Sequence, residues 1–492
     1  MALRKGVTTI QATCCILDAE EAVLGRLEDR GSRLTTLCTS YVAADARGAV
    51  PVLGHTLALL RDPRRFLRSL SDQGDLVWIR VGHSRILVVC DPELTHQLLV
   101  NDRDFDKGGP WVDRLREILG NSLVSCPRSQ HRRFRRLIQP AFHKSRLPDY
   151  SVAMVDQTTA VVDGWKDGQT LDVYAGMQEI TARIIARTMF ASPASDTVVD
   201  VARAALNVIV TNAGKRLFLP PLLARIPTRG KRRYDQARRE IREITDTLIA
   251  DYRAAGVDHH DLMSMLLAAR DEEDGSALTE QEVSDHVVTL FLGGMETTAS
   301  TLGWALCLLA QHPDVERRLQ QEVDAVVGDE VPSYKHVPDL KFASAILTES
   351  MRLFAPGWML TRRTSDACEL GGHTIPADTD VIYSPYILHH RGDLFPDPDR
   401  FDPDRWTGEP ARLPRGALVP FSGGPRKCVG DDFAMAEGAL ILACFVSRWQ
   451  LHPVERDVRP KQRFGLVLAP RKQRVRITRR RRDFSSSYDA GG

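Results

Sequence analysis

The sequence lacks the features that mark a membrane, secreted or nucleic-acid-binding protein. Only 7% of its 492 residues are aromatic, and net charge is +2 from 66 basic and 64 acidic side chains. The longest apolar stretch near the N-terminus, Ile10–Leu17, contains Gln11 and Thr13 and falls short of the roughly 20 apolar residues of a membrane span. Nine cysteines are an odd number for a disulfide framework. We therefore expect a cytoplasmic protein with no secretory signal, membrane span or nucleic-acid partner.

The chain has the composition of a folded protein and the pattern of one large domain. Hydrophobic residues make up 43% of it, an ordinary share for a globular protein. We expect residues 1–45 to form a poorly ordered extension, residues 46–480 to form the domain, and residues 481–492 to form a polar tail. The interpretation is mainly α with a small β part.

The elements of this domain follow from periodicity. Leu76–Val81 and Arg85–Cys90 alternate as a β-hairpin, and Arg474–Thr478 alternates as an edge strand. Thr279-Glu-Gln-Glu is a capping box that opens the longest helical pattern, Glu280–Gln311, about 45 Å long. Most of that helix is apolar all round, which predicts a buried central helix.

One ten-residue stretch has a clear chemical meaning. Residues Phe421–Gly430 read Phe-Ser-Gly-Gly-Pro-Arg-Lys-Cys-Val-Gly, and a helical pattern follows. Cys428 therefore lies where a loop meets a helix N-terminus, whose N–H groups can stabilise a thiolate. The glycines let the backbone approach a flat ligand, and Arg426 offers a fork for a carboxylate. This set suits an axial thiolate to haem iron, with Arg426 on a haem propionate. A buried structural cysteine is the alternative.

This stretch resembles the cysteine motif of the cytochrome P450 family of haem-thiolate monooxygenases at every defined position. The resemblance covers roughly residues 48–480 and implies the cytochrome P450 fold, with the long central helix over the haem. It implies haem b as the cofactor, Cys428 as its axial iron ligand, and Phe421 and Arg426 as haem-binding residues.

A second motif of the family is Glu349-Ser-Met-Arg352, in a helical pattern that ends before Pro356. Glu349 and Arg352 share a helix face and can pair. On their own they could be a solvated ion pair worth roughly a few tenths of a kcal/mol. The resemblance instead implies a buried structural network that includes Arg405.

The long helix carries two adjacent glycines, Gly293 and Gly294, each costing about 1 kcal/mol relative to alanine in a helix. Close packing of helices is one explanation, and a groove over the haem iron is the other. The sequence that follows, Met-Glu-Thr, completes a P450 pattern. The resemblance implies that Thr297 assists oxygen activation and that Glu296 helps to relay protons for O–O cleavage.

Further haem-binding residues are implied by the resemblance. His131 and Arg135 are four residues apart on one face of a predicted helix and correspond to propionate-binding positions. Arg362 matches a third such position better than its neighbour Arg363.

The remaining basic residues of the same helix suggest a partner surface. Arg132 and Arg136 are expected to form a solvated face, and with Arg133 and Lys427 they could receive an acidic ferredoxin. A solvated face with no partner is the alternative.

The function implied is insertion of one atom of O2 into a small apolar molecule, with electrons from ferredoxin and ferredoxin reductase. A terpenoid is favoured, because Pro51–Leu60 and Trp358–Arg363 resemble bacterial terpenoid oxygenases. A macrolide, polyketide or fatty acid is the alternative substrate, and a peroxygenase or a non-oxygenating haem protein is the alternative function. We expect the pocket to be formed by the loop at residues 105–124, the long helix near Leu290, residues 356–360 and the turn at residues 464–468.

Overall fold

The computed structural model describes residues 41–190, 196–217, 228–408, 412–454, 461–471 and 473–481. The chain divides into two compact units between Val42 and Ala43, and the second unit is the one described below. Most of the predicted extension and nearly all of the predicted polar tail lie outside the described residues. Strand β1 (Ala43–Asp45) nevertheless pairs in parallel with β2 (Leu76–Val81). This strand lies at the end of the predicted extension, and its three residues are too few to leave a periodic signal in the sequence.

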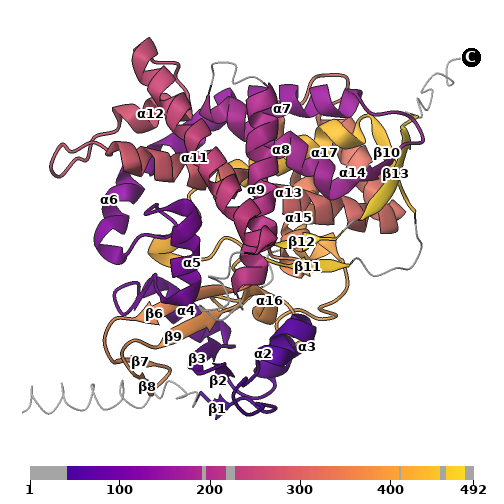
Figure 1. The fold of residues 1–492 in the computed structure, drawn as a ribbon. Coiled ribbons are helices and arrows are strands. Elements are labelled where there is room, and N and C mark those ends of the chain that lie inside the picture. The colour runs from indigo at the N-terminus through magenta and orange to yellow at the C-terminus, as the bar shows by residue number, and fades with distance from the viewer. Residues whose placement is uncertain are drawn as a thin grey trace, which may run out of the picture. The chain divides into compact units, whose positions relative to one another are not determined.

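Helices dominate this unit and fill the upper part of Figure 1, as the sequence predicted. Besides the central helix, the described helices are α2 (Thr56–Arg61), α3 (Pro63–Ser71), α4 (Pro92–Val100), α5 (Gly109–Leu119), α6 (Arg128–Ile138), α7 (Leu147–Asp163), α8 (Val173–Met189), α9 (Asp196–Leu217), α11 (Arg229–Ala255), α12 (Leu262–Ala268), α14 (Pro313–Val326), α15 (Lys341–Leu353), α16 (Pro385–Leu388) and α17 (Asp431–Val446).

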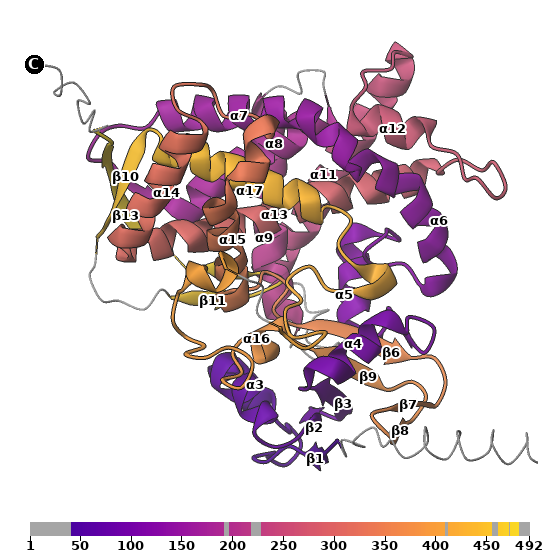
Figure 2. The ribbon, with the colours of Figure 1, turned by 180° about the vertical axis from the view of Figure 1, so that it is seen from behind.

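Helix α13 (Glu280–Gln311) is the predicted central helix, with the bounds that the sequence indicated. The Thr279 hydroxyl accepts from the Glu282 N–H, and the Glu282 carboxylate accepts from the Thr279 N–H, so the capping box is confirmed. Most of its residues from Val283 onward are buried. Helices α8 and α17 pack against α13, which lies among the other helices of this unit (Figure 2).

The strands form small sheets at the edges of the helical part. A six-stranded sheet has the order β1-β2-β3-β9-β6-β4, where β3 is Ser84–Val89, β9 is Asp380–Tyr383, β6 is Leu360–Thr364 and β4 is Phe105–Asp106. The predicted hairpin is its β2–β3 pair. Two-stranded sheets pair β7 (Cys368–Leu370) with β8 (His373–Ile375), and β11 (Gln462–Phe464) with β12 (Leu468–Pro470).

The strand predicted at residues 474–478 is present as β13 (Arg474–Arg479), but it is not an edge strand. It lies between β10 (Trp449–Pro453) and β5 (Thr170–Asp172). The prediction failed because β5 has only three residues and its partner is about 300 residues away in sequence. Strand pairing over such a separation leaves no local signal.

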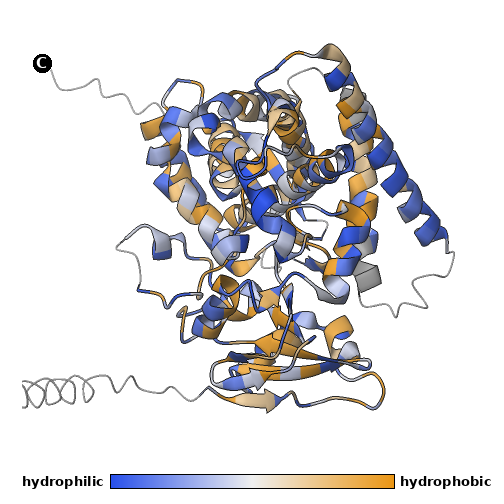
Figure 3. Cartoon of the chain, turned by 90° about the vertical axis from the view of Figure 1, so that its left-hand side faces the viewer, coloured by the Kyte–Doolittle hydropathy of each residue, from blue (hydrophilic) through white to orange (hydrophobic). Residues whose placement is uncertain are grey.

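Buried hydrophobic side chains form clusters between the elements. The six-stranded sheet at the bottom of Figure 3 is built largely from hydrophobic residues. The Trp304 ring of α13 stacks on Phe354 with centroids 3.9 Å apart, which fixes α13 against the end of α15. Within the described ranges no helix combines the length and apolar character that a membrane crossing requires.

Candidate functional site

A cavity of about 380 Å³ lies beside α13 and contains the Cys428 side chain on its wall. Its lining comes from all four of the segments that the sequence predicted for the pocket, since it includes Trp111, Leu290, Met359 and Val467. The segment at residues 105–124 is not only a loop, however, because it contains strand β4 and the eleven-residue helix α5. Most of the lining is apolar, so the cavity suits an apolar guest.

Cys428 lies in the loop that precedes α17, as its motif predicted. Its backbone N–H donates to the Phe421 carbonyl at 3.0 Å, which closes the loop. Gly424 has φ +62°, and a Cβ there would lie 2.0 Å from the Leu99 carbonyl oxygen, so only glycine fits. This steric limit explains why the motif has a glycine at position 424.

The Cys428 thiol faces the cavity and differs in this from the other described cysteines. Cys90, Cys126, Cys307 and Cys444 are buried, and Cys368 is half-buried; all are free thiols. Burial among protein atoms raises the pKa of the Cys428 thiol, while the Gly430 N–H and the Arg135 and Lys427 charges lower it. A cation at the sulfur would favour the thiolate further.

Basic side chains gather along the lining of the cavity. Lys107, His131, Arg135 and Arg426 all line it. The pKa of His131 falls to about 3, first because the ring is buried and then because these cations and Arg362 repel a proton. Basic groups held this close together predict an anionic ligand in the cavity, because a negative charge would offset the repulsion that lowers the pKa values of His131 and Lys107.

Arg362 and Arg363, the two candidates for the third propionate position, have different surroundings in the structure. Arg363 pairs with Asp380 at 2.9 Å and is partly exposed. Arg362 is 1% exposed, and its Nη1 donates only to the adjacent Thr361 carbonyl. Its Nη2 has no hydrogen-bond partner within the described part of the chain. A buried donor of this kind calls for an acceptor, so Arg362 is the better candidate.

Lys107 is a member of this cluster that the sequence did not reveal. Burial, followed by repulsion from Arg362 and Arg426, holds the pKa of its amine well below the usual range. Lys107 belongs to no motif and stands about 320 residues from Arg426 in the chain. Only the fold brings it to the cavity.

Two of the predicted arginines already have protein partners. Arg135 donates from Nη1 to the Lys427 carbonyl at 2.6 Å and from Nε to Gln139 at 2.9 Å. It therefore clamps the cysteine loop against α6. Arg426 donates from Nη2 to Asp106 at 2.7 Å and from Nη1 to the Cys126 carbonyl at 3.0 Å, while its Nε has no partner among the described residues.

The predicted network around Glu349 is confirmed. Arg352 donates from Nε and Nη2 to the Glu349 carboxylate, both at 2.8 Å, and both side chains are fully buried. Arg405 lies 3.5 Å from the same carboxylate. Trp406, which the sequence did not indicate, donates to it at 2.9 Å. The solvated ion pair considered from sequence is wrong for this site.

Gly293 and Gly294 have different roles. A Cβ at Gly293 would meet nothing within 4 Å and would point into the cavity, whereas a Cβ at Gly294 would lie 2.9 Å from Ile185 of α8. The two explanations considered from sequence thus each apply to one glycine. Gly293 keeps the cavity open, and Gly294 allows close packing of α13 on α8.

The acid and the alcohol of α13 face in different directions. Thr297 lies open to the cavity, and its hydroxyl donates to the Gly293 carbonyl at 2.5 Å. Glu296 is 1% exposed, and its carboxylate accepts from Tyr174 and, at 2.8 Å, from Gln178, both on α8. The resemblance implies that the two residues act together, but neighbouring side chains on a helix point about 100° apart.

A second buried acid lies behind the cavity wall. Glu437 on α17 is 1% exposed, hydrogen-bonds with Thr298 and has an Oε2 atom with no partner within the described ranges. Burial raises its pKa to about 8, so the carboxyl is neutral at pH 7.

The arginine run on α6 is less solvated than predicted. Arg136 binds the buried Asp271 through Nη2 at 2.9 Å and Glu273 through Nη1 at 2.8 Å. Arg133 pairs with Glu282 at 3.0 Å. Arg132 is exposed as predicted. The expectation for Arg136 was wrong because its acidic partners lie about 135 residues downstream.

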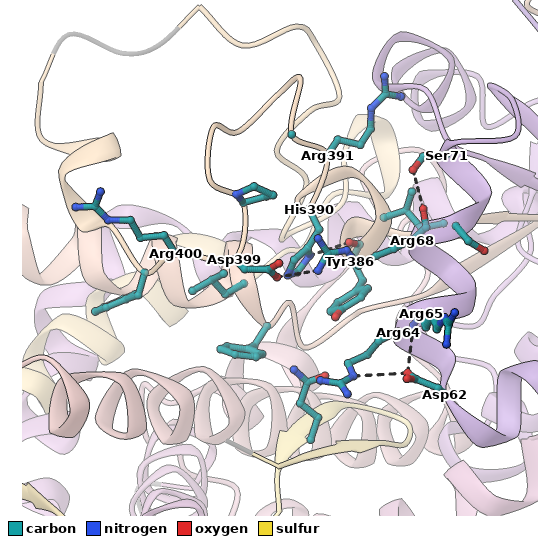
Figure 4. A pocket seen from close by; sticks show the side chains of 18 of the residues that line it. Asp62, Arg64, Arg65, Arg68, Ser71, Tyr386, His390, Arg391, Asp399 and Arg400 are labelled. Atoms are coloured by element: carbon teal, nitrogen blue, oxygen red, sulfur yellow. Dashed lines mark hydrogen bonds and ion pairs between the residues drawn. The ribbon is translucent and has the colours of Figure 1, made fainter. Parts of the chain in front are cut away.

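A larger recess of about 1020 Å³ lies elsewhere, between α3, α16 and the loop after α16. Figure 4 shows its polar lining, in which Arg68 pairs with Asp399 at 2.7 Å and Arg64 with Asp62 at 3.7 Å. None of the described cysteines lines it. The acidic and basic side chains of this recess largely neutralise one another. It therefore differs from the cavity at Cys428, where a thiol lies near several basic groups.

The residues of the smaller cavity fit a haem. The Cys428 thiol on one wall can ligate iron, and Lys107, His131 and Arg426 on the lining can bind propionates. Arg362 lies behind this lining, close enough to lower the pKa of each of the three, and its Nη2, which has no partner among the described residues, can donate to a propionate as well. The space at Gly293 leaves room on the opposite wall.

Comparison with known proteins agrees with this geometry. The family model for cytochrome P450 matches residues 46–477. The chain is 45% identical to cyclooctat-9-en-7-ol 5-monooxygenase of Streptomyces melanosporofaciens, over 84% of this chain and 90% of that protein. It is 41% identical to cyclooctatin synthase of the same organism, over 86% and 94%. It is 39% identical to pentalenene oxygenase of Streptomyces avermitilis, over 90% and 98%.

Proposed function

Because this chain belongs to the cytochrome P450 family and is a monooxygenase, we propose that it hydroxylates a terpenoid at a haem b held by Cys428. The single observation that carries this proposal is the Cys428 thiol on the wall of an apolar cavity that is also lined by the basic residues Lys107, Arg135 and Arg426. Residues 46–480 form the catalytic domain in this proposal.

The haem would be held at both its iron and its propionates. Cys428 supplies the thiolate, Phe421 lines the cavity beside it, and Arg362, Arg426 and His131 receive the propionates, with Arg135 securing the cysteine loop. When bound, the haem supplies activation of O2 with two external electrons, and the thiolate donates electron density that favours O–O cleavage. Lys107 adds a further cation on the propionate side.

The protein's own contribution is positioning, proton supply and exclusion of water. Thr297 lines the cavity, and its hydroxyl, which donates to the Gly293 carbonyl, would turn from that carbonyl to donate a hydrogen bond to oxygen. Glu296 is the acid one residue away and is the proposed proton source. The apolar lining from α5, α13 and the β11–β12 turn excludes bulk water and orients the substrate by contact.

Two observations favour a terpenoid over a macrolide or a fatty acid. The three relatives named above cover nearly the whole domain, and two of their names contain a terpenoid substrate. The lining of the cavity is mostly apolar, which fits a hydrocarbon skeleton better than a polar macrocycle. Ferredoxin and its reductase are the proposed electron donors, and the cytoplasm is the proposed location.

The proposed substrate class can be tested by binding and turnover. The purified haem protein is titrated with cyclooctat-9-en-7-ol, pentalenene, a macrolide and a fatty acid, and the absorption change of the haem is recorded. We expect the terpenoids to give a saturable change and an oxygenated product with ferredoxin, reductase and O2. Binding and product only with the fatty acid or the macrolide would contradict the terpenoid assignment. A product formed with peroxide but never with O2 and electrons would favour the peroxygenase alternative.

A further inference from the structure

The Glu296 carboxylate is held by more than its two partners on α8. Arg463 of strand β11 lies 3.7 Å from Glu296 Oε1, and its Nη2 donates to the Tyr174 hydroxyl at 3.3 Å. The guanidinium also lies over the Tyr174 ring, 5.5 Å from its centroid. Glu296, Tyr174, Gln178 and Arg463 form the group that we name the acid clamp.

The acid clamp holds the Glu296 carboxylate towards α8, although Glu296 is also one of the residues that line the cavity. Tyr174 and Gln178 are one turn apart on α8 and each donates to a different oxygen of Glu296. Hydrogen bonds to a charged acceptor in a buried place are among the strong ones in proteins. Glu296 can deliver a proton towards Thr297 only after its side chain leaves these donors.

Arg463 is the least buried member of the acid clamp. Its side chain is 30% exposed, whereas Glu296, Tyr174 and Gln178 are almost fully buried. It is also the member that does not belong to the α8–α13 pair. A movement of β11 would therefore change the clamp without disturbing the packing of α8 on α13.

The strand that carries Arg463 also forms part of the cavity. In the β11–β12 hairpin, Arg463 pairs with Ala469, and the turn between the strands places Leu466 and Val467 on the cavity wall. The Leu468 carbonyl accepts from Ser300 and Trp304 of α13, at 2.6 and 3.1 Å. Strand β12 thus fixes the hairpin to α13. The turn of the hairpin lines the cavity, and Arg463 of β11 contacts Glu296.

We propose that Arg463 and Tyr174 are positioning residues that hold Glu296 towards α8, and that an occupant pressing on the Leu466–Val467 turn releases it towards the cavity. This inference rests on the proposed function, because it takes Glu296 as the proton source. The acid–alcohol pattern of α13 does not by itself include Tyr174, Gln178 or Arg463. Proton supply would then depend on substrate being present, which limits wasteful reduction of O2.

The first test uses electron consumption without substrate. Holoenzyme, ferredoxin, reductase and O2 are combined, and peroxide release is measured for wild type, Arg463→Gln and Tyr174→Phe. We expect about a tenfold rise in both variants, a change of ~1.4 kcal/mol in barrier. The double variant Arg463→Gln/Glu296→Gln should return to the level of Glu296→Gln alone. Arg474→Gln, an exposed arginine on β13, is the matched control and should leave release unchanged.

The second test observes the Glu296 carboxyl group directly by infrared spectroscopy and does not require turnover. Infrared difference spectra are recorded before and after binding an imidazole that carries a biphenyl group, whose ligation to haem is followed by absorption. The Glu296 carboxyl band is identified by its loss in Glu296→Gln. We expect the probe to shift this band in wild type, and the band to be already shifted in Arg463→Gln without the probe.

The outcomes separate this inference from the proposed function. An unmoved Glu296 band with the probe bound, or unchanged peroxide release in both variants, would overturn the acid clamp while leaving the haem-thiolate assignment intact. Failure of the probe to ligate, in a protein that also lacks the thiolate-type spectrum, would overturn the proposed function itself.

Discussion

At the scale of single residues, Thr297 is the hydroxyl of α13 placed to act on oxygen in the cavity. Thr297→Ala removes that hydroxyl and leaves the helix backbone and the apolar lining in place. We expect substrate binding to be unchanged and product per electron consumed to fall by roughly tenfold or more, because proton delivery is misdirected and peroxide is released. Product and peroxide are quantified against electrons supplied. Thr297→Ser, which keeps a hydroxyl, is the control, and equal coupling in all three proteins would refute the role.

Glu437 provides a prediction about pH and stability. Its pKa in the folded protein is about 8, above its ordinary value near 4.5. Below pH 4.5 the folded and unfolded chains both hold this proton, so burial carries no ionisation penalty. As pH rises to 8 only the unfolded chain ionises, and stability is lost by at most about 1.4 kcal/mol per pH unit. Glu437→Gln cannot ionise.

The free energy of unfolding of the holoprotein, measured with urea at pH 5 and pH 8, tests this. Relative to wild type, the stability of Glu437→Gln should increase between the two pH values. The comparison between variant and wild type removes the opposite contributions of buried histidines such as His389, whose pKa is lowered to about 3. A difference that does not vary with pH would mean that Glu437 is ionised when buried.

At the scale of elements, the Glu349 network ties helix α15 to the loop that follows α16. Arg352 donates to the backbone carbonyls of His389, Pro398 and Arg400 as well as to Glu349. Arg352→Ala would leave Glu349 buried without its cation, which costs roughly 3–5 kcal/mol. We expect loss of haem retention and a lower urea midpoint. Arg318→Ala, which breaks the exposed pair with Asp404, is the control and should cost less than about 1 kcal/mol. Equal effects of the two changes would contradict a structural role for the network.

The elements also show which parts of the site sequence can predict. The cysteine loop, the capping box of α13 and the Glu349–Arg352 pair are local patterns, in which a few neighbouring residues determine the geometry. Lys107, Trp406 and the acid clamp were not predicted, because each depends on contacts between segments far apart in the chain. Arg463 meets Glu296 across 167 positions, and nothing near either residue signals the other. The true partners of Arg133 and Arg136 were missed for the same reason.

At the scale of the whole molecule, the ion pairs on α6 reduce the number of its arginines that are available to bind ferredoxin. Arg133 and Arg136 are engaged with acids, whereas Arg132 is exposed one turn before Arg135, which holds the Lys427 carbonyl. Arg132→Gln should slow ferredoxin-driven turnover by severalfold and flatten its dependence on salt, while peroxide-driven turnover stays unchanged. Arg133→Gln should instead lower stability. Equal loss in both assays for Arg132→Gln would exclude a docking role.

The central claim is that Cys428 is the protein ligand of a haem iron, and the absorption spectrum of the reduced carbon-monoxide complex tests it most directly. The measurement compares wild type, Cys428→Ser and Cys368→Ser, the last a half-buried cysteine on β7. We predict the thiolate-specific band in wild type and in Cys368→Ser, and its loss in Cys428→Ser with the fold retained by circular dichroism. A band that persists in Cys428→Ser, or that wild type never shows, would contradict the account.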